Sequence, residues 1–423
     1  MAAPLSRTPA RFGAPAPLIA HLAAAAEIAE SGARLAPLAG SPRFPWGERP
    51  GEEARALAEA VAAAPQLEMS LALRSAGAAR LAEMARGLRR YQRSRVRRRL
   101  VEPPVFWSRG SARLLDYGEG GGAPMLVTPS LINDHRILDL DGPRGPGGGS
   151  LMRWLARRGL RPLLLDWGAP AAEELGFSLG DYVERRLIPA FDAAADALGP
   201  PALMGYCMGG TLTVALAARR RAPRLVLIGA PWDFDGMAPM RGALAALGFA
   251  GERAALARAV DAVGSVFGAV PVSALQAVFA QLDPGLAARK FRRYAATPPR
   301  SIAARRFVLI EDWLNGGAPL AGPTAREALI DWHLDNATRR RRWRVAGDVV
   351  DPRAIAAPTL IVAATKDRIA PPAAAEPLAE DLAHARILRP EAGHVGMIVG
   401  ADAVRRLWHP LADFLAGTSA KGE

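Results

Sequence analysis

The single cysteine of the chain, Cys207, lies in a segment suited to a reactive nucleophile. The segment Gly205–Gly210 (GYCMGG) follows an expected strand, Ala202–Met204, and precedes an expected helix, Thr211–Arg219. Glycines on both sides let the backbone turn sharply without a Cβ clash, which leaves the side chain at the apex exposed. The positive end of the helix favours a thiolate. We therefore predict a nucleophilic Cys207. The alternative is a buried, inert cysteine, the common fate of a single cysteine.

A thiolate nucleophile needs a base, and in enzymes that use such a turn the acid and then the histidine follow later in the chain. Three of the six histidines follow the expected strand Pro358–Ala363, at positions 384, 394 and 409. His394 comes directly after the last expected strand, in the loop segment EAGHVG. His384 falls before that strand and His409 in the terminal helix, where packing or surface roles are expected. We predict His394 as the base.

The acid is expected after the preceding strand, and Asp367 stands there in the segment AATKDRI. A carboxylate at this place could accept the second N–H of His394 and fix its tautomer. The alternative is a turn aspartate that caps a helix beginning near Ala373. Asp381 lies too far along that helix to compete.

Backbone amides are expected to stabilise the oxyanion of an acyl transfer. One is the N–H of Met208, and the other should follow the early strand Pro124–Thr128, in the segment PSLIN. Ile132 or Leu131 would donate from this segment, and we take Ile132 as the candidate. The alternative is an ordinary strand-to-helix loop.

The elements that must position these residues alternate between strand and helix from about residue 104, which is typical of a mostly parallel sheet. We expect an N-terminal helical extension (1–103), a catalytic α/β core (104–232 and 346–423) and a helical cap or lid inserted between them (233–345). Trp313, Trp332 and Trp343 of the insertion are expected to pack in its core, the alternative being a substrate channel. The expected strands are Arg113–Tyr117, Pro124–Thr128, Arg161–Asp166, Ala202–Met204, Arg224–Ile228, Pro358–Ala363 and Arg386–Leu388. The expected helices are Leu22–Ala36, Ala54–Ala63, Leu71–Leu88, Leu151–Arg158, Leu179–Leu198, Thr211–Arg219 and Ala403–Phe414.

The composition narrows the classes of partner. The chain has 423 residues, half of them hydrophobic, with a formal net charge of +13 that comes almost entirely from arginine. An arginine excess in an Ala-, Gly- and Pro-rich chain resembles coding bias, so we predict no nucleic-acid partner. We expect the run Arg89–Arg99 to be a solvated helix face that leads into a linker, the alternative being that it binds anions. One cysteine excludes an internal disulfide and disfavours a zinc site, which suits a reducing cytoplasm. We expect no targeting segment and no membrane span.

Five segments together resemble poly(3-hydroxyalkanoate) synthases. Their amino-acid sequences are most similar to those of the shorter class of synthase, which works with a partner subunit. They are GYCMGGTL, PSLINDHRILDL, WLARRGLRPLLLDWG, DYVERRLIPAFDAAADALG and GHVGM, and the resemblance covers about residues 105 to 415. It implies an α/β-hydrolase fold that transfers 3-hydroxyacyl groups from 3-hydroxyacyl-CoA to a growing polyester. By the resemblance, Cys207 carries the acyl group as a thioester, and His394 with Asp367 activates the 3-hydroxyl of the next unit.

The resemblance also implies that CoA is a substrate moiety and product, with no separate cofactor or metal. The implied partners are the polyester product, a granule surface in the cytoplasm, and a second copy or an accessory synthase subunit. The first hundred residues match the family only weakly. Two alternatives stay open: a thioesterase, esterase or depolymerase with the same Cys-His-Asp triad, and a non-catalytic granule-associated protein.

Overall fold

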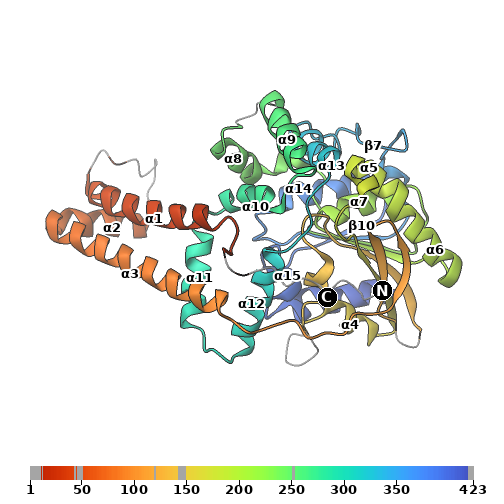
Figure 1. The fold of residues 1–423 in the computed structure, drawn as a ribbon, viewed down its shortest axis with the longest axis horizontal. Coiled ribbons are helices and arrows are strands. Elements are labelled where there is room, and N and C mark those ends of the chain that lie inside the picture. Colours follow the sequence, from red (N-terminus) through yellow and green to blue (C-terminus); the bar gives the residue numbers. More distant parts are fainter. Residues whose placement is uncertain are drawn as a thin grey trace. The chain divides into compact units, whose positions relative to one another are not determined.

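A computed structural model describes residues 11, 13–41, 44, 51–118, 121–141, 149–249 and 253–417 (Figure 1). The chain forms two compact units. The first comprises Met1–Val96 and Asp283–Val308, and the second comprises Arg97–Leu282 and Leu309–Glu423. Residues 283–308, which the sequence analysis assigned to the cap, therefore cluster with the N-terminal helices. The division into extension, core and cap stays a prediction.

The first unit is helical, and the helices expected in the first hundred residues are present with longer bounds. Aromatic and aliphatic side chains, among them Met84, Tyr91 and Phe291, form a core of its own. In the basic run, Arg90 is not simply solvated, because its guanidinium donates to the carbonyls of Tyr294 and Thr297 at 2.7 and 2.6 Å. The helices are α1 (Leu18–Leu35), α2 (Glu52–Ala63), α3 (Gln66–Gln92), α11 (Leu286–Ala296) and the first residues of α12 (Ile302–Leu314).

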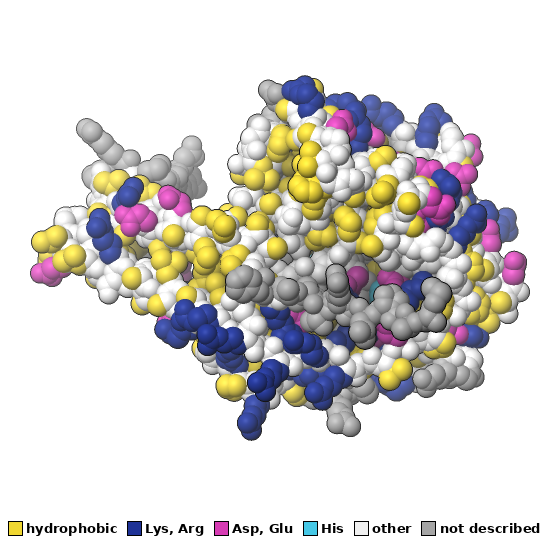
Figure 2. Space-filling view, viewed as in Figure 1, with side chains coloured by type: hydrophobic (Ala, Val, Ile, Leu, Met, Phe, Trp, Pro, Cys, Tyr) yellow, Lys and Arg dark blue, Asp and Glu magenta, His cyan; other side chains and the backbone are white. Residues whose placement is uncertain are grey.

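Several large apolar side chains of this unit remain exposed, and Figure 2 shows hydrophobic surface along its helices. A few helices around a small core leave their outer apolar residues without a second layer to cover them. The exposed residues are Ile19, Leu22, Ile28, Leu35, Leu38, Leu57, Leu67, Leu71, Leu286 and Ile302.

The second unit is built on an eight-stranded sheet of order β1-β2-β4-β3-β5-β6-β9-β10, in which β2 alone runs against the others. This confirms the predicted α/β class with a mostly parallel sheet. The edge strand β1 was not predicted, since it is short and half-exposed and follows two prolines. The strands are β1 (Val105–Arg109), β2 (Ala112–Asp116), β3 (Ala123–Thr128), β4 (Leu160–Asp166), β5 (Ala202–Tyr206), β6 (Leu225–Ile228), β9 (Thr359–Val362) and β10 (Ala385–Leu388).

A short hairpin was also not predicted. It consists of two strands of two residues each, β7 (Arg344–Val345) and β8 (Asp348–Val349). Its turn residues Ala346 and Gly347 have φ of 51° and 84°. Two-residue strands are too short to show an alternating pattern, so the sequence carries no signal for them.

The predicted helix Leu179–Leu198 is present but is interrupted by a π-helical turn, Val183–Leu187. Pro189 has no amide to donate to the preceding turn, which accounts for the change in hydrogen bonding. Ser178 and Asp181 form a reciprocal capping box at the start of this helix: the Asp181 amide donates to Ser178 Oγ at 3.1 Å, and the Ser178 amide donates to Asp181 Oδ2 at 2.8 Å.

The other helices of the second unit fall into two groups. Those of the sheet region are α4 (Leu151–Ala156), α5 (Leu179–Tyr182), α6 (Ile188–Leu198), α7 (Met208–Ala217), α14 (Pro372–Ala375), α15 (Gly396–Val399) and α16 (His409–Ala416). We call the second group the cap helices: α8 (Ala238–Ala246), α9 (Arg253–Phe267), α10 (Val272–Gln281), α13 (Gly322–Arg326) and the π-helical segment Glu327–Trp332 (Figure 1). In the described ranges, no helix combines the length and apolar character needed to cross a bilayer.

Candidate active site

Cys207 occupies the turn between β5 and α7, at the carboxyl ends of the parallel strands. Its amide donates to the Ile228 carbonyl at 2.9 Å, and its carbonyl accepts from the Gly210 amide at 2.8 Å. The backbone of Cys207 has φ 57° and ψ −134°. Residues other than glycine rarely adopt a positive φ of this size. The surrounding structure holds this strained conformation, as is common where a side chain must be presented to a substrate.

The glycines around Cys207 are required by close backbone approaches. A Cβ at Gly205 would lie 2.4 Å from Cα of Gly210, and a Cβ at Gly209 would lie 2.2 Å from the carbonyl oxygen of Pro129. Atoms cannot approach so closely, so only glycine lets β5, α7 and the loop after β3 meet at this point.

Asp367 and His394 are joined by a buried hydrogen bond of 2.6 Å between Oδ2 and Nδ1. The other carboxylate oxygen accepts from the amides of Ile369 and Ala370 at 2.8 and 2.9 Å. Asp367 thus also has the turn-capping role given above as the alternative. Its Oδ1 accepts from the backbone amides and its Oδ2 contacts the imidazole. Because the carboxylate is held by the backbone, it fixes the orientation of the imidazole.

The His394 ring lies over the carboxyl end of β6, the strand next to β5. A Cβ built on Gly229 would come within 3.0 Å of His394 Cε1. Tyr206, directly before Cys207, stacks on the ring with a centroid distance of 5.0 Å and an interplanar angle of 26°. Its hydroxyl donates to the His394 carbonyl at 3.3 Å. Tyr206 was not predicted from the sequence, because nothing in its local pattern separates it from a packing tyrosine.

Electrostatics favour a charged imidazole at this place. Burial by itself would lower the pKa of His394, but the negative charges of Asp367 and Cys207, and its interactions with both side chains, raise the pKa well above its usual value. Nε2 of His394 is buried, and no donor or acceptor of the described residues is aligned with it for a hydrogen bond. Asp367 occupies Nδ1, so Nε2 is the nitrogen left to exchange a proton with the nearby sulfur.

Cys207 opens into a cavity of about 60 Å³ that is lined almost entirely by apolar side chains. Met208 and Ile132 line it as well, whereas Leu131, the other donor considered, does not. Met208 begins α7, so its amide has no partner within the helix. The Ile132 amide makes a long contact of 3.3 Å to Ser130 Oγ. The remaining lining residues are Pro231, Phe234, Met237, Met240, Leu275, Val278, Phe279, Leu320, Ala328, Leu329, Trp332, His333, Ile369 and Ala370.

Other residues weighed in the sequence lie elsewhere. Asp381 pairs with Arg339 and Arg341 at 2.7 and 3.0 Å. The ring of His409, at the start of α16, contacts Trp154 with a centroid distance of 5.1 Å. All three tryptophans of the predicted cap region are buried, and of these only Trp332 lines the cavity.

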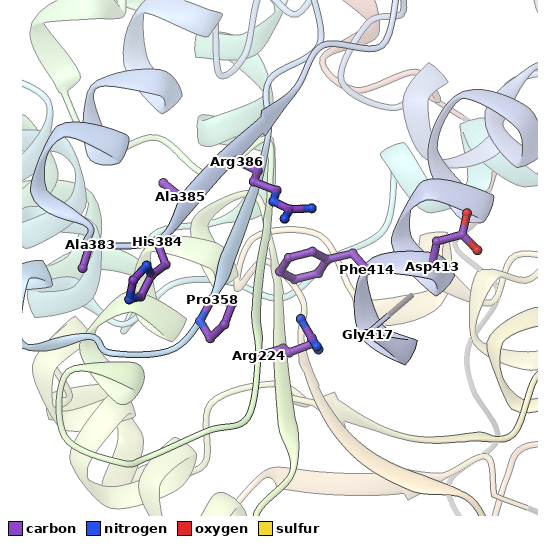
Figure 3. A pocket seen from close by; sticks show the side chains of 9 residues that line it. All are labelled: Arg224, Pro358, Ala383, His384, Ala385, Arg386, Asp413, Phe414 and Gly417. Carbon is purple, nitrogen blue, oxygen red and sulfur yellow. The ribbon is translucent and has the colours of Figure 1, made fainter. Parts of the chain in front are cut away.

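A second hollow, of about 480 Å³, lies at the amino ends of β6, β9 and β10, the sheet edge opposite to Cys207 (Figure 3). His384 lines it beside Pro358, and the Phe414 ring lies between Arg224 and Arg386 (Figure 3). None of the residues predicted for catalysis takes part in it. Its lining is Arg224, Pro358, Ala383, His384, Ala385, Arg386, Asp413, Phe414 and Gly417.

Comparison with known proteins gives the fold family. Residues 189–401 match the family model described as alpha/beta hydrolase fold, which is half of the chain. The chain belongs to the α/β-hydrolase fold family. The match begins in α6 and runs past His394, so it includes the turn of Cys207, the cap helices and the loop of Asp367.

Within this family the chain is similar to proteins named poly(3-hydroxyalkanoate) polymerase subunit PhaC, which confirms the resemblance carried by the motifs. The protein from Haloferax mediterranei is 29% identical over 330 residues, covering 75% of this chain and 64% of the relative. That from Haloarcula marismortui is 30% identical over 307 residues, covering 71% and 62%. That from a Synechocystis strain is 26% identical over 301 residues, covering 69% and 77%. The chain thus spans less than two thirds of the first two relatives.

Proposed function

We propose that this chain is an acyltransferase of the poly(3-hydroxyalkanoate) synthase type, which transfers 3-hydroxyacyl groups from 3-hydroxyacyl-CoA to a growing polyester. The observation that carries the proposal is the arrangement of a strained Cys207 turn beside a buried, carboxylate-oriented His394, at an apolar cavity. The named relatives support the same substrate class.

In the first step the Cys207 thiolate attacks the thioester carbonyl carbon of 3-hydroxyacyl-CoA. A carbon–sulfur bond to Cys207 forms, the bond to CoA breaks, and the CoA thiolate takes a proton from the His394 imidazolium. The raised pKa of His394 supports a thiolate–imidazolium pair as the resting state. The amides of Met208 and Ile132 would stabilise the oxyanion, for which Ile132 must turn from Ser130 Oγ.

In the second step the 3-hydroxyl of another unit attacks the acyl-Cys207 carbonyl. His394 takes the hydroxyl proton, an ester bond forms, and the Cys207 thiolate is released for the next cycle. Asp367 holds Nδ1 throughout, so Nε2 is the atom that gains and loses the proton. A thiol suits this cycle because one thioester exchanges readily with another.

The apolar lining of the cavity supports transfer over hydrolysis. Almost no polar side chain is available there to hold an attacking water, so a hydroxyl delivered on an acyl chain is favoured over water. We further propose that no cofactor is needed beyond the CoA of the substrate. A second copy or an accessory subunit, and a polyester granule surface in the cytoplasm, are the partners that this function implies.

The proposal is tested by mixing purified protein with 3-hydroxybutyryl-CoA and following CoA release, turbidity and intact mass. We expect CoA release, a 3-hydroxybutyryl adduct on Cys207, and oligomers of the hydroxy acid. Cys207→Ala should abolish all three. Release of free 3-hydroxybutyrate without oligomers would indicate a hydrolase instead. An equally active Cys207→Ala variant would refute the nucleophile, and an inactive wild-type protein would favour a non-catalytic role.

A further inference from the structure

The orientation of the His394 imidazole depends on more than its carboxylate. One hydrogen bond of 2.6 Å holds Nδ1 on Asp367. A single hydrogen bond fixes one atom of the ring but holds the tilt of the ring plane only loosely. A second contact, on the face of the ring, is needed to keep Nε2 beside Cys207 in the geometry for proton transfer.

Tyr206 makes this second contact, and it touches His394 at two places. Its ring stacks on the imidazole with a centroid distance of 5.0 Å and an interplanar angle of 26°. Its hydroxyl donates to the carbonyl of the same histidine at 3.3 Å, so its polar end has a partner inside the protein. Both residues are buried, and Tyr206 ends β5, directly before Cys207. The strand that presents the sulfur therefore also presents the surface on which the imidazole lies.

The ring of Tyr206 also faces the charge that His394 carries. The ionisable side chains that act on this charge are Asp367 and Cys207. The face of an aromatic ring attracts a cation within about 6 Å, and most strongly away from water. Burial raises the pKa of Tyr206 well above its usual value, so the phenol stays neutral and is no competing base. Tyr206 therefore acts through the face of its ring.

We infer that Tyr206 is a positioning residue of the proposed reaction, whose ring face holds the charged imidazole of His394 with Nε2 beside Cys207. The inference rests on the proposed function and deepens it. Tyr206 is not among the residues that line the cavity, so it acts on the histidine and not on the acyl group.

The first test separates the ring of Tyr206 from its hydroxyl. Tyr206→Phe keeps the stacked ring, whereas Tyr206→Leu keeps an apolar side chain without a ring. Acylation by 3-hydroxybutyryl-CoA, with enzyme in excess, should stay within about threefold of wild type in Tyr206→Phe and slow about 5- to 30-fold in Tyr206→Leu.

Tyr294→Leu is the matched control. Tyr294 is also buried and stacked, on Phe307 with a centroid distance of 4.2 Å, but it belongs to the other compact unit. Its replacement should lower the stability in urea unfolding and leave the acylation rate within about twofold.

The second test is a pH titration of His394, followed by NMR of protein with isotope-labelled histidine, in which His394→Gln assigns the signal. Loss of the attracting ring face should lower the midpoint in Tyr206→Leu, and Tyr206→Phe should keep the midpoint of wild type. If Tyr206 only buried the histidine, its loss would raise the midpoint, because burial lowers the pKa of an imidazole. The direction of the change therefore separates positioning from packing.

A midpoint that is unchanged or higher in Tyr206→Leu would overturn the inference, as would equal losses of rate in Tyr206→Leu and Tyr206→Phe. If Tyr206→Leu does not fold, Tyr206→Met makes the same comparison, since its unbranched side chain adapts to the space without a ring. Failure of the proposed function looks different. The wild-type protein would then release no CoA, whereas the titration needs no acyl substrate and would still report on Tyr206.

Discussion

Replacement of Asp367 by asparagine tests how the buried carboxylate acts on His394. The change keeps the size of the side chain and an oxygen to accept from the amides of Ile369 and Ala370. It removes the charge beside Nδ1, and an amide NH₂ placed there would favour the wrong imidazole tautomer. We therefore expect a folded protein with a poor base.

The magnitude follows from the 2.6 Å contact. A hydrogen bond to a charged group contributes about 1.5–3 kcal/mol. Two charges about 4 Å apart at an effective dielectric constant of about 20 attract by about 4 kcal/mol. These contributions overlap, so we take about 3–4 kcal/mol, and acylation should slow by about 10²- to 10³-fold.

The assay is rapid-quench measurement of CoA release from 3-hydroxybutyryl-CoA in a single turnover. Asp381→Asn is the matched control, since this carboxylate pairs with Arg339 and Arg341 away from the cavity. It should leave the rate within about twofold, because such a pair contributes little to the site. A rate for Asp367→Asn within about fivefold of wild type would refute the reasoning.

Three further predictions concern the turn, the thiol and the cap helices. Gly205→Ala should cost at least about 2–3 kcal/mol of unfolding free energy in denaturant titrations, because its Cβ would meet backbone at 2.4 Å. Gly242→Ala, in α8 and with open space around the new Cβ, should instead leave the stability unchanged or raise it by up to about 1 kcal/mol. His394→Gln should slow alkylation of Cys207 by iodoacetamide at pH 7 by at least about tenfold, since Nε2 of His394 is the nitrogen left to take the thiol proton; an unchanged rate would contradict this. The pKa of His333 is about 4 in the folded protein and 6.5 in an unperturbed histidine. Protonation therefore favours the unfolded chain, and the stability that the neutral ring contributes is complete above pH 6.5 and is lost as the pH falls towards 4. Between pH 7.5 and pH 5, wild type should therefore lose about 2 kcal/mol more than His333→Gln in urea unfolding, and equal losses would disprove a buried neutral ring.

The sequence by itself determined the elements that carry the site. The apolar run before Cys207, the glycines on both sides of it and the apolar run after it predict a strand, a sharp turn and a helix. These features depend only on neighbouring residues and on the space that a Cβ needs, and the structure has all three. The same holds for the loops of Asp367 and His394, since each directly follows a short apolar run that the structure forms as a strand. The order of parallel strands then allows their carboxyl ends to meet at one edge.

Only the tertiary structure determined how the loops of Cys207, Asp367 and His394 come together and which helices form the cavity beside them. The pairing of β6 with β9 and of β9 with β10 brings His394 next to β5, and no local pattern encodes such long-range pairing. The cavity exists only because the cap helices pack near Cys207, which is why His333 and Trp332 looked like ordinary helix residues in the sequence. Residues 283–308 likewise cluster with the N-terminal helices through the apolar core around Tyr91 and Phe291, because helical periodicity shows that a face is apolar but not which partner buries it.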